Sequence, residues 1–403
     1  MSTFYTCVDR YSNDILFRGY KNGKAIKERI KYKPTFYVPG NSDSTFKTLD
    51  GKPVEPIMPG TMRECRQFLD EYKDVGNFKV HGNANYIHQF ISDAFLDRGV
   101  KPDRDLVNVT SIDIEVQSDK GFPQPDKAEH PITAITIKNN IDNKFYVWGL
   151  SDWSPEKSEL KKEIIDNVVY VQCDTEAALL MKFLDKWSSN YPDVITGWNS
   201  RLFDTTYIVN RVRIILGEDM MKKLSPWGIV NERSIHIAQR KHQAFDLYGM
   251  QQLDYLDCFK KFGYSYGMQE SYKLDNIAHV VLNERKLDYS EYGSLNNLYL
   301  ENHQKFIDYN IRDVDIVDRL EDKMGLIPLS MTVAYKGLVN YADSFGSVGV
   351  WDAILFNELR KRNIVVPPKQ SREKERKIEG AYVKDPQNGS HEWVVSFDLN
   401  SLY

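Results

Sequence analysis

The chain has 403 residues, more than one compact domain usually contains, which predicts two or three domains. Its 41% hydrophobic and 27% charged residues are typical of a globular protein and exclude a disordered chain or a disulfide-stapled mini-fold. With 53 basic and 57 acidic residues, the chain lacks the positive excess that binding nucleic acid through bulk electrostatics alone requires. The longest apolar runs are strand-sized, so no membrane span is expected, and the first residues do not resemble a signal peptide.

The four cysteines lie far apart and form no CxxC pair. A zinc knuckle is therefore not expected, and the thiols fit a reducing compartment.

The first hundred residues are predicted to form a small α+β unit. Strand patterns cover residues 4–8, 15–20 and 26–32, with the turn signal Asn22-Gly23 between the last two, and a helix is expected over residues 61–72. Six basic residues lie between positions 21 and 33. They fit either a solvated strand face or a surface that contacts nucleic acid.

From residue 106 onward, strands are followed by alternating strands and helices, which predicts a mixed sheet covered by helices, as in a ribonuclease-H-like fold. The expected strands are residues 106–116, 132–137, 144–148, 168–172 and 194–197. Asp174 is expected to cap the first of six helices, which are residues 175–189, 204–216, 256–262, 273–282, 302–311 and 314–323. A hairpin over residues 235–247 is expected to turn through the polar residues 240–242, and a charged linker is expected near residue 371.

Two carboxylates, Asp113 and Glu115, stand at the end of a strand that is otherwise apolar. Residues i and i+2 of a strand share a face, so both side chains point the same way. Two like charges side by side are unfavourable there, and a bound cation reverses that effect.

Two further motifs carry acids on predicted helices. Asp204 follows Asn199 and Phe203 and lies in the first turn of a helix, where an acid also has the simpler explanation of a favourable helix dipole. Tyr309 and Asp313 are four residues apart, so on a helix the phenol and the carboxylate are neighbours.

Together the three motifs supply four carboxylates and one tyrosine on a sheet-and-helix pattern. Hard oxygen ligands of this kind suit Mg²⁺ or Mn²⁺ rather than zinc. A carboxylate-rich site that holds two divalent ions is a known arrangement for cleaving phosphodiesters.

Eight stretches carry a family resemblance over the whole chain: Asp113-Ile-Glu-Val116, Gly121-Phe-Pro123, Thr196-Gly-Trp-Asn199, Leu224-Ser-Pro226, Leu253-Asp-Tyr-Leu-Asp257, Tyr309-Asn-Ile-Arg-Asp313, Gly380-Ala-Tyr-Val383 and Ser396-Phe-Asp-Leu-Asn-Ser-Leu-Tyr403. The three carboxylate motifs resemble the DEDD exonuclease superfamily, in the subclass whose third motif carries tyrosine. More closely, the chain resembles the N-terminal part of family B DNA polymerases of T-even-like bacteriophages, including marine relatives.

The resemblance implies a 3′–5′ proofreading exonuclease that removes mismatched 3′-terminal nucleotides. The ligands of its two Mg²⁺ ions, for which Mn²⁺ is expected to substitute, would be Asp113, Glu115, Asp204 and Asp313. Tyr309 would orient the attacking water.

The same resemblance implies which residues contact DNA. Phe122 would stack on the frayed primer end, Asn199 and Phe203 would shape the site, and Lys286 would meet the scissile phosphate. The hairpin over residues 235–247 would correspond to the family's strand-separating wedge.

The last motif resembles the start of a polymerase active site. Asp398 and the backbone carbonyl of Leu399 would bind a catalytic metal, and Tyr403 would act as the steric gate against a 2′-hydroxyl. One carboxylate cannot form a two-metal site, so polymerisation is expected only from a full-length or reassembled protein.

The domains implied are residues 1–105 and 326–370 as two segments of an N-terminal domain, 106–325 as the exonuclease, and 371–403 as the beginning of a palm. The fold class is thus α/β and α+β. Two alternatives stay open: a nucleic-acid-binding module that regulates its own messenger RNA, and the N-terminal subunit of a split polymerase.

The implied partners are primer–template DNA, single-stranded 3′ ends and the remaining polymerase domains. A phage sliding clamp and a single-strand binding protein would act through the complete polymerase. No membrane contact is expected, and the place of action would be the cytoplasm of an infected bacterium.

Overall fold

The computed structural model describes residues 3–118, 121–237, 240–368 and 384–396, and it divides into two units, residues 1–368 and 369–403. In the second unit, residues 384–396 are exposed and form neither helix nor strand. The predicted linker from residue 371 and the predicted metal ligands and steric gate, Asp398, Leu399 and Tyr403, lie outside the described residues. Everything below concerns the first unit.

A three-stranded antiparallel sheet opens the chain, with strands β1 (Thr3–Tyr11), β2 (Asp14–Lys21) and β3 (Lys24–Lys31) in that order. The turn between β2 and β3 places Asn22 and Gly23 at positive φ, as the Asn-Gly signal predicts. β1 and β2 are largely buried, whereas β3 is an exposed edge strand. The basic stretch therefore lies on the most solvated strand of this sheet.

A second small sheet joins a segment from the first sixty residues to the last strand of the first unit. Its strand order is β15–β5–β6–β4, and the short strand β15 (Ile364–Val365) pairs in parallel with β5 (Phe46–Thr48). The other strands are β4 (Phe36–Pro39) and β6 (Pro53–Ile57). The sequence analysis did not predict this sheet, because its strands are two to five residues long and carry little periodicity.

The helix predicted over residues 61–72 is α1 (Met62–Glu71). The Thr61 side chain accepts from the backbone of Glu64 and the Glu64 side chain accepts from the backbone of Thr61, which is a capping box. The second helix of this region, α2 (Tyr86–Phe95), was not predicted.

The central element is a six-stranded mixed sheet of order β10–β9–β8–β7–β11–β14. β7 pairs antiparallel with β8 and parallel with β11, so it lies inside the sheet. The strands are β7 (Val109–Val116), β8 (Ile132–Asn139), β9 (Phe145–Gly149), β10 (Val168–Gln172), β11 (Val194–Thr196) and β14 (Gln251–Gln252). Five of these were predicted, and the two-residue β14 was not.

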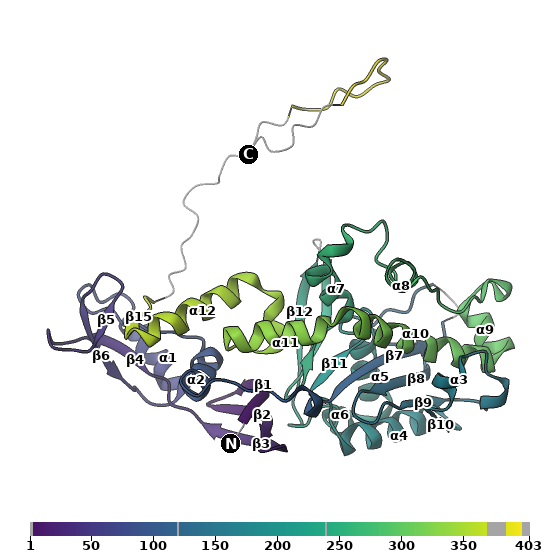
Figure 1. Ribbon diagram of the computed structural model, residues 1–403, viewed down its shortest axis with the longest axis horizontal. Helices are drawn as coiled ribbons and strands as arrows, with labels where there is room; N and C mark the ends of the chain where they lie inside the picture. Colours follow the sequence, from purple (N-terminus) through teal and green to yellow (C-terminus); the bar gives the residue numbers. More distant parts are fainter. Residues whose placement is uncertain (1–2, 119–120, 238–239, 369–383, 397–403) are drawn as a thin grey trace. The chain divides into compact units, whose positions relative to one another are not determined.

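Helices cover both faces of this sheet (Figure 1). On one face, Ile112 and Ile114 of β7 belong to the core built with α4 (Glu176–Ser189) and α5 (Asp204–Leu216). On the other face, Ala134 of β8 packs with Phe306 and Ile307 of α10 (His303–Met324). The alternation along β7 therefore turns Asp113 and Glu115 toward α10.

The structure corrects three local predictions. Thr175, not Asp174, caps α4, with its hydroxyl accepting from the backbone of Ala178. The helices predicted over residues 302–311 and 314–323 form one helix, α10, because Arg312 and Asp313 between them are buried rather than solvated. Residues 240–242 lie inside strand β13 (Arg240–Leu247), which pairs with β12 (Val230–Ile237), so the hairpin is confirmed but its turn is not there.

The remaining helices surround this framework. They are α3 (Lys162–Ile165), α6 (Glu218–Lys222), α7 (Tyr255–Phe262), α8 (Leu274–Leu282), α9 (Leu295–Glu301), α11 (Leu326–Gly337) and α12 (Ser347–Lys361). Among the described residues, no helix combines the length and apolar character needed to cross a membrane. All four cysteines are buried and unpaired.

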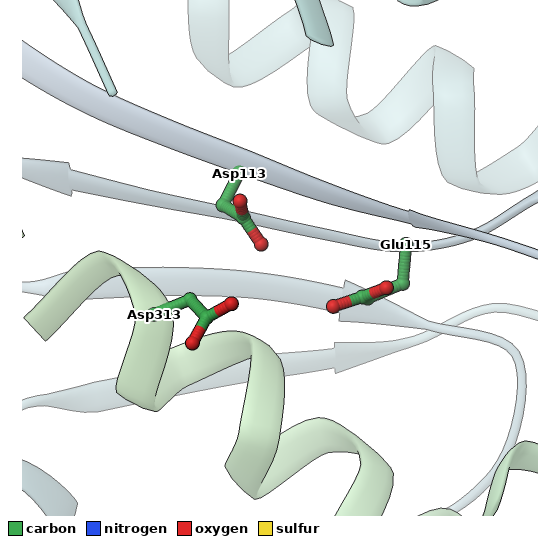
Figure 2. A group of neighbouring side chains, drawn as sticks. All are labelled: Asp113, Glu115 and Asp313. Carbon is green, nitrogen blue, oxygen red and sulfur yellow. The ribbon is translucent and has the colours of Figure 1, made fainter. Parts of the chain in front are cut away.

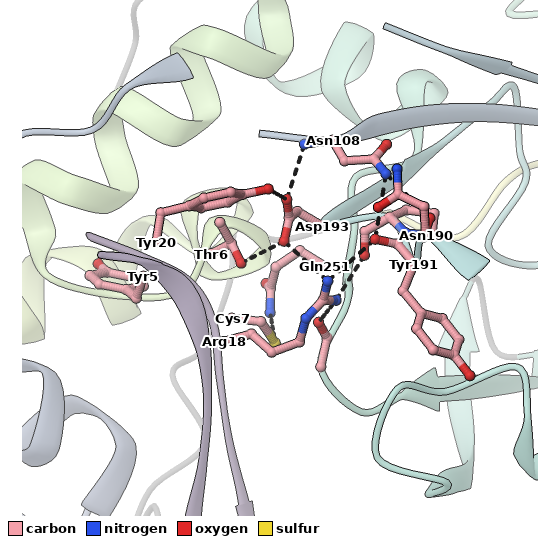
Figure 3. A network of polar contacts seen from close by, with 12 residues as sticks. Tyr5, Thr6, Cys7, Arg18, Tyr20, Asn108, Asn190, Tyr191, Asp193 and Gln251 are labelled. Atoms are coloured by element: carbon pink, nitrogen blue, oxygen red, sulfur yellow. Dashed lines mark hydrogen bonds and ion pairs between the residues drawn. The ribbon is translucent and has the colours of Figure 1, made fainter. Parts of the chain in front are cut away.

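A buried polar network connects the first sheet to the central sheet (Figure 3). The Asp193 carboxylate, directly before β11, accepts from the Thr6 hydroxyl (2.8 Å), the Tyr20 hydroxyl (2.9 Å) and the Asn108 backbone (3.0 Å). Arg18 adds an ion pair to Asp193 at 3.4 Å and donates to the Pro192 carbonyl at 2.8 Å. Strands β1 and β2 are thereby fixed to the start of β11.

Candidate exonuclease active site

Three carboxylates from two of the predicted motifs meet between β7 and α10. One carboxylate oxygen from each of Asp113, Glu115 and Asp313 lies within 4.8 Å of the others. Figure 2 shows the two strand carboxylates directed at the helix that carries Asp313. Glu115 and Asp313 are 7% and 5% exposed, so solvent screens their mutual repulsion poorly.

The fourth carboxylate, Asp204, lies beside this group rather than within it. It is the first residue of α5, is 3% exposed, and accepts a hydrogen bond from the Ile114 backbone at 2.9 Å. β11 pairs with β7 only as far as Ser111, so Asp204 takes the place of a strand partner for that amide. Asp204 thus lies against the strand between the two carboxylates of β7.

Burial raises the pKa values of all four carboxyl groups above their usual range. For Asp113 the charge of Asp313 raises the pKa further, and for Glu115 and Asp204 the charge of Asp113 does so. Lys286 opposes the increase at Asp313. The four groups would be easier to ionise with a cation among them.

Lys286 and Tyr309 complete the charged group. The Lys286 ammonium forms an ion pair with Asp313 and lies 4.4 Å from the centroid of the Tyr309 ring. Burial lowers the pKa of Lys286, but the charges of Asp313 and Tyr309 and the hydrogen bonds to both together outweigh it, so the net shift of this pKa is upward. Burial, then the charge of Asp313, raises the pKa of the Tyr309 phenol, so this hydroxyl keeps its proton at neutral pH.

All these residues line one cleft of about 1220 Å³. Phe122, Asn199 and Phe203 line it as well, as the sequence analysis expected. The Phe122 ring is 71% exposed, with its centroid 5.1 Å from that of Phe203. This pair offers an open aromatic surface beside the carboxylates, and Asn199 adopts a left-handed backbone conformation (φ 64°) at the cleft wall.

Two residues that hold the site were not assigned a role from the sequence. Asn310 donates from Nδ2 to Asp113 Oδ2 at 2.6 Å, and Thr136 donates to the Asn310 carbonyl oxygen. Asp254, before α7, accepts from the backbones of Asn199 and Arg201 at 3.0 Å each. Both stand inside motifs quoted above, but their contacts cross 53 to 197 residues of sequence, which no local pattern reveals.

The donor set fits a divalent hard cation. Asp313 Oδ1 is buried without a hydrogen-bond partner, an arrangement that would leave a charged oxygen unsatisfied unless a ligand meets it. Carboxylate oxygens are the ligands that Mg²⁺ and Mn²⁺ prefer. The site therefore has the chemistry of a metal-assisted hydrolase.

Comparison with known proteins agrees with this geometry. The sequence model of the exonuclease domain of DNA polymerase family B matches residues 74–277, half of the chain. That domain has a ribonuclease-H-like fold, in agreement with the mixed sheet and its two helical layers.

Similar proteins include the DNA-directed DNA polymerases of Escherichia phage RB69 and Enterobacteria phage T4. Each is 34% identical over 100% of this chain, which aligns with 46% of the viral protein. The DNA polymerase delta catalytic subunit of Candida albicans is 26% identical over 74% of this chain and 29% of its own length. The chain spans about half the length of the phage relatives.

Proposed function

The chain belongs to DNA polymerase family B, and on that premise we propose that its cleft is a metal-dependent 3′–5′ exonuclease site that proofreads newly made DNA. The substrate would be a frayed or single-stranded 3′ end, and the products deoxynucleoside monophosphates. One observation carries the proposal: three carboxylates, two buried and one partly buried, whose oxygens lie within 4.8 Å of one another in a cleft of about 1220 Å³.

Four carboxylates would hold the metal ions: Asp113, Glu115, Asp204 and Asp313. We propose two Mg²⁺ ions, replaceable by Mn²⁺. When bound, such ions lower the pKa of an attacking water and stabilise the charge that develops on the leaving oxygen. The carboxylates would fix the ions from two sides, since two come from a strand and two from helices.

The attacking water and the phosphate would be positioned by Tyr309 and Lys286. The protonated Tyr309 hydroxyl can donate to the water or accept from it, and it is fixed by its place on α10. The Lys286 ammonium pairs with Asp313 at the proposed metal site. There it would neutralise negative charge on a phosphate oxygen of the substrate.

The terminal nucleotide would lie against Phe122 and Phe203. The face of an aromatic ring stacks on any base, which suits an exonuclease that removes every kind of terminal nucleotide. Asn199 would contribute hydrogen bonds from the cleft wall.

The activity of the whole polymerase is also a proposal. We assign residues 106–325 to the exonuclease, 1–105 and 326–370 to an N-terminal domain, and 371–403 to the start of a palm. Asp398 and Leu399 would bind metal in that palm, with Tyr403 as its steric gate. Primer–template DNA, the remaining polymerase domains, a sliding clamp and a single-strand binding protein would be its partners in an infected bacterium.

The direct test uses a 5′-labelled single-stranded oligonucleotide with Mg²⁺. Shortening one nucleotide at a time from the 3′ end, with nucleoside monophosphate released and activity lost in excess EDTA, is the expected result. Internal cleavage, shortening from the 5′ end, or equal activity in EDTA would contradict the proposal.

A further inference from the structure

The segment that carries Lys286 is anchored to α10 by the side chain of Glu284. Asn283 ends α8 in a left-handed conformation, and Glu284 follows directly. Glu284 Oε2 accepts from Arg312 Nη2 at 2.5 Å, and Oε1 accepts from Arg319 Nη2 at 2.7 Å. Hydrogen bonds from Arg319, then those from Arg312, lower the pKa of Glu284 to about 2, so the carboxylate is ionised at neutral pH.

The two arginines are themselves fixed on α10. Arg312 is 8% exposed and forms a second ion pair, to Asp315, at 2.5 Å. Arg312 and Arg319 are seven residues apart and so lie on one face of the helix. Asp313 immediately follows Arg312 on α10. The arginines that bind Glu284 and the carboxylate that pairs with Lys286 therefore lie on neighbouring turns of one helix.

Lys286 is also fixed from the α8 side. Asp275 Oδ1 accepts from the Lys286 backbone at 3.0 Å, and Asp275 Oδ2 accepts from Arg285 Nη1 at 2.6 Å. The main chain of Lys286 is therefore held between two carboxylates, Glu284 through α10 and Asp275 through α8. Its side chain then needs only to extend to Asp313 and Tyr309.

We propose that Glu284 is a positioning residue for Lys286: by binding Arg312 and Arg319 it places the lysine ammonium at Asp313 and at the scissile phosphate. This inference rests on the proposed exonuclease function. A lysine side chain has several rotatable bonds, so its ammonium reaches one point reliably only if the main chain that carries it is fixed. Fixing the Lys286 backbone in advance sets the direction in which the side chain leaves the chain.

The expected effect of Glu284→Gln is a fall in kcat of about tenfold with little change in KM, because a misdirected cation weakens the transition state. Lys286→Ala lowers kcat at least as much. The double variant equals Lys286→Ala alone, because Glu284 acts only through the lysine.

The experiment measures single-turnover and steady-state rates on a 5′-labelled single strand for wild type, both single variants and the double variant. Glu291→Gln is the matched control, since Glu291 is exposed and pairs with Lys305 at 2.7 Å without touching Lys286. Wild-type kinetics are expected for this control. Thermal melting of each variant confirms that it is folded at the assay temperature.

Three results would overturn the inference: Glu284→Gln with wild-type kcat, additive losses in the double variant, or an effect confined to KM. If Glu284→Gln is unfolded, Asp275→Ala replaces it in the same cycle, because it removes the carboxylate that accepts from the Lys286 backbone and leaves α10 unchanged. An inactive wild type would instead contradict the proposed function.

Discussion

Lys286 is an internal cation for the carboxylate cluster. Its ammonium pairs with Asp313 and neutralises part of the charge that burial concentrates between β7 and α10. A divalent ion on the same carboxylates would take over that role. The metal-free and metal-bound proteins should therefore depend on this side chain to different extents.

We predict that Lys286→Met lowers the free energy of unfolding of the metal-free protein by about 2 kcal/mol, the usual contribution of a hydrogen bond between charged groups. With saturating Mn²⁺ the loss should be smaller, because the ion stabilises the carboxylates in both proteins. Urea unfolding with EDTA and with Mn²⁺ measures both values. An equal loss in the two conditions would contradict the internal-cation role.

The four carboxylates that we propose as metal ligands could be selected from the sequence because each obeys a local rule. Asp113 and Glu115 alternate on a strand, and Asp204 and Asp313 occupy definite helix positions. The residues that orient them could not, since the contacts of Asn310 and Asp254 are set by which elements pack together. Glu284 was missed for the same reason: its arginines are 28 and 35 residues away.

At the scale of elements, the turn from β11 to α5 depends on a close approach of two backbones. A Cβ on Gly197 would lie 2.4 Å from the Ile112 carbonyl oxygen, and Gly197 has φ of 152°. Only glycine fits there, and the turn it allows carries Asn199, Phe203 and Asp204 into the cleft.

Gly197→Ala should lower the free energy of unfolding by about 2 kcal/mol, since either the strands separate or the turn shifts. Gly349 in α12 is the matched control: a Cβ there meets nothing within 4 Å, and Gly349→Ala should raise stability by about 0.5 kcal/mol. Urea unfolding compares the two variants. Similar effects from both would show that the close approach does not matter.

At the junction of α10 and α11, a buried carboxyl group should make the stability of the protein depend on pH. Gly325 provides no side chain to cap α11, and Glu321 Oε2 instead accepts from the backbones of Leu326 (3.0 Å) and Ile327 (3.2 Å). Burial raises the pKa of Glu321 from 4.5 to about 7. The protonated form is therefore favoured in the folded protein, and this stabilisation is complete below pH 4.5 and is lost as pH rises through 7.

Glu321→Gln cannot ionise but keeps an oxygen that can accept both bonds. Relative to wild type, its free energy of unfolding should increase between pH 5 and pH 8, by up to about 3 kcal/mol. Urea unfolding at the two pH values provides the comparison. A difference between the proteins that does not change with pH would contradict the argument.

Periodicity predicted most of the central sheet and the helices that follow its strands, because buried faces dictate the spacing of apolar residues there. It divided α10 in two at Arg312 and Asp313, because two adjacent charged residues resemble a solvated break although both are buried. It did not predict α11 and α12, whose burial is set by packing against other elements. In the second sheet, the short strand β15 is defined by its pairing with β5 across more than 300 residues.

At the scale of the whole first unit, the network around Asp193 joins the first sheet to the central sheet. The carboxylate is 2% exposed and receives four polar contacts, from Thr6, Tyr20, Asn108 and Arg18. An amide cannot accept all of these bonds, because its nitrogen is itself a donor.

Asp193→Asn should therefore destabilise the protein by about 2 kcal/mol, the cost of unsatisfied buried donors and a weakened ion pair. Asp219→Asn is the matched control. It breaks a pair with Lys222 at 2.9 Å in which Asp219 is 97% exposed, and no measurable change in stability is expected. Equal urea midpoints for Asp193→Asn and wild type would show that the network contributes little.

The account depends most on the carboxylates that meet between β7 and α10. The measurement that tests it most directly is release of nucleoside monophosphate from a 3′-mismatched primer with Mg²⁺, by wild type and by Asp113→Ala/Glu115→Ala. We predict rapid release by the wild type and a loss of at least about a thousandfold in the variant, since the proposed metal site would lose two of its four carboxylates. Equal rates from the two folded proteins would contradict the account.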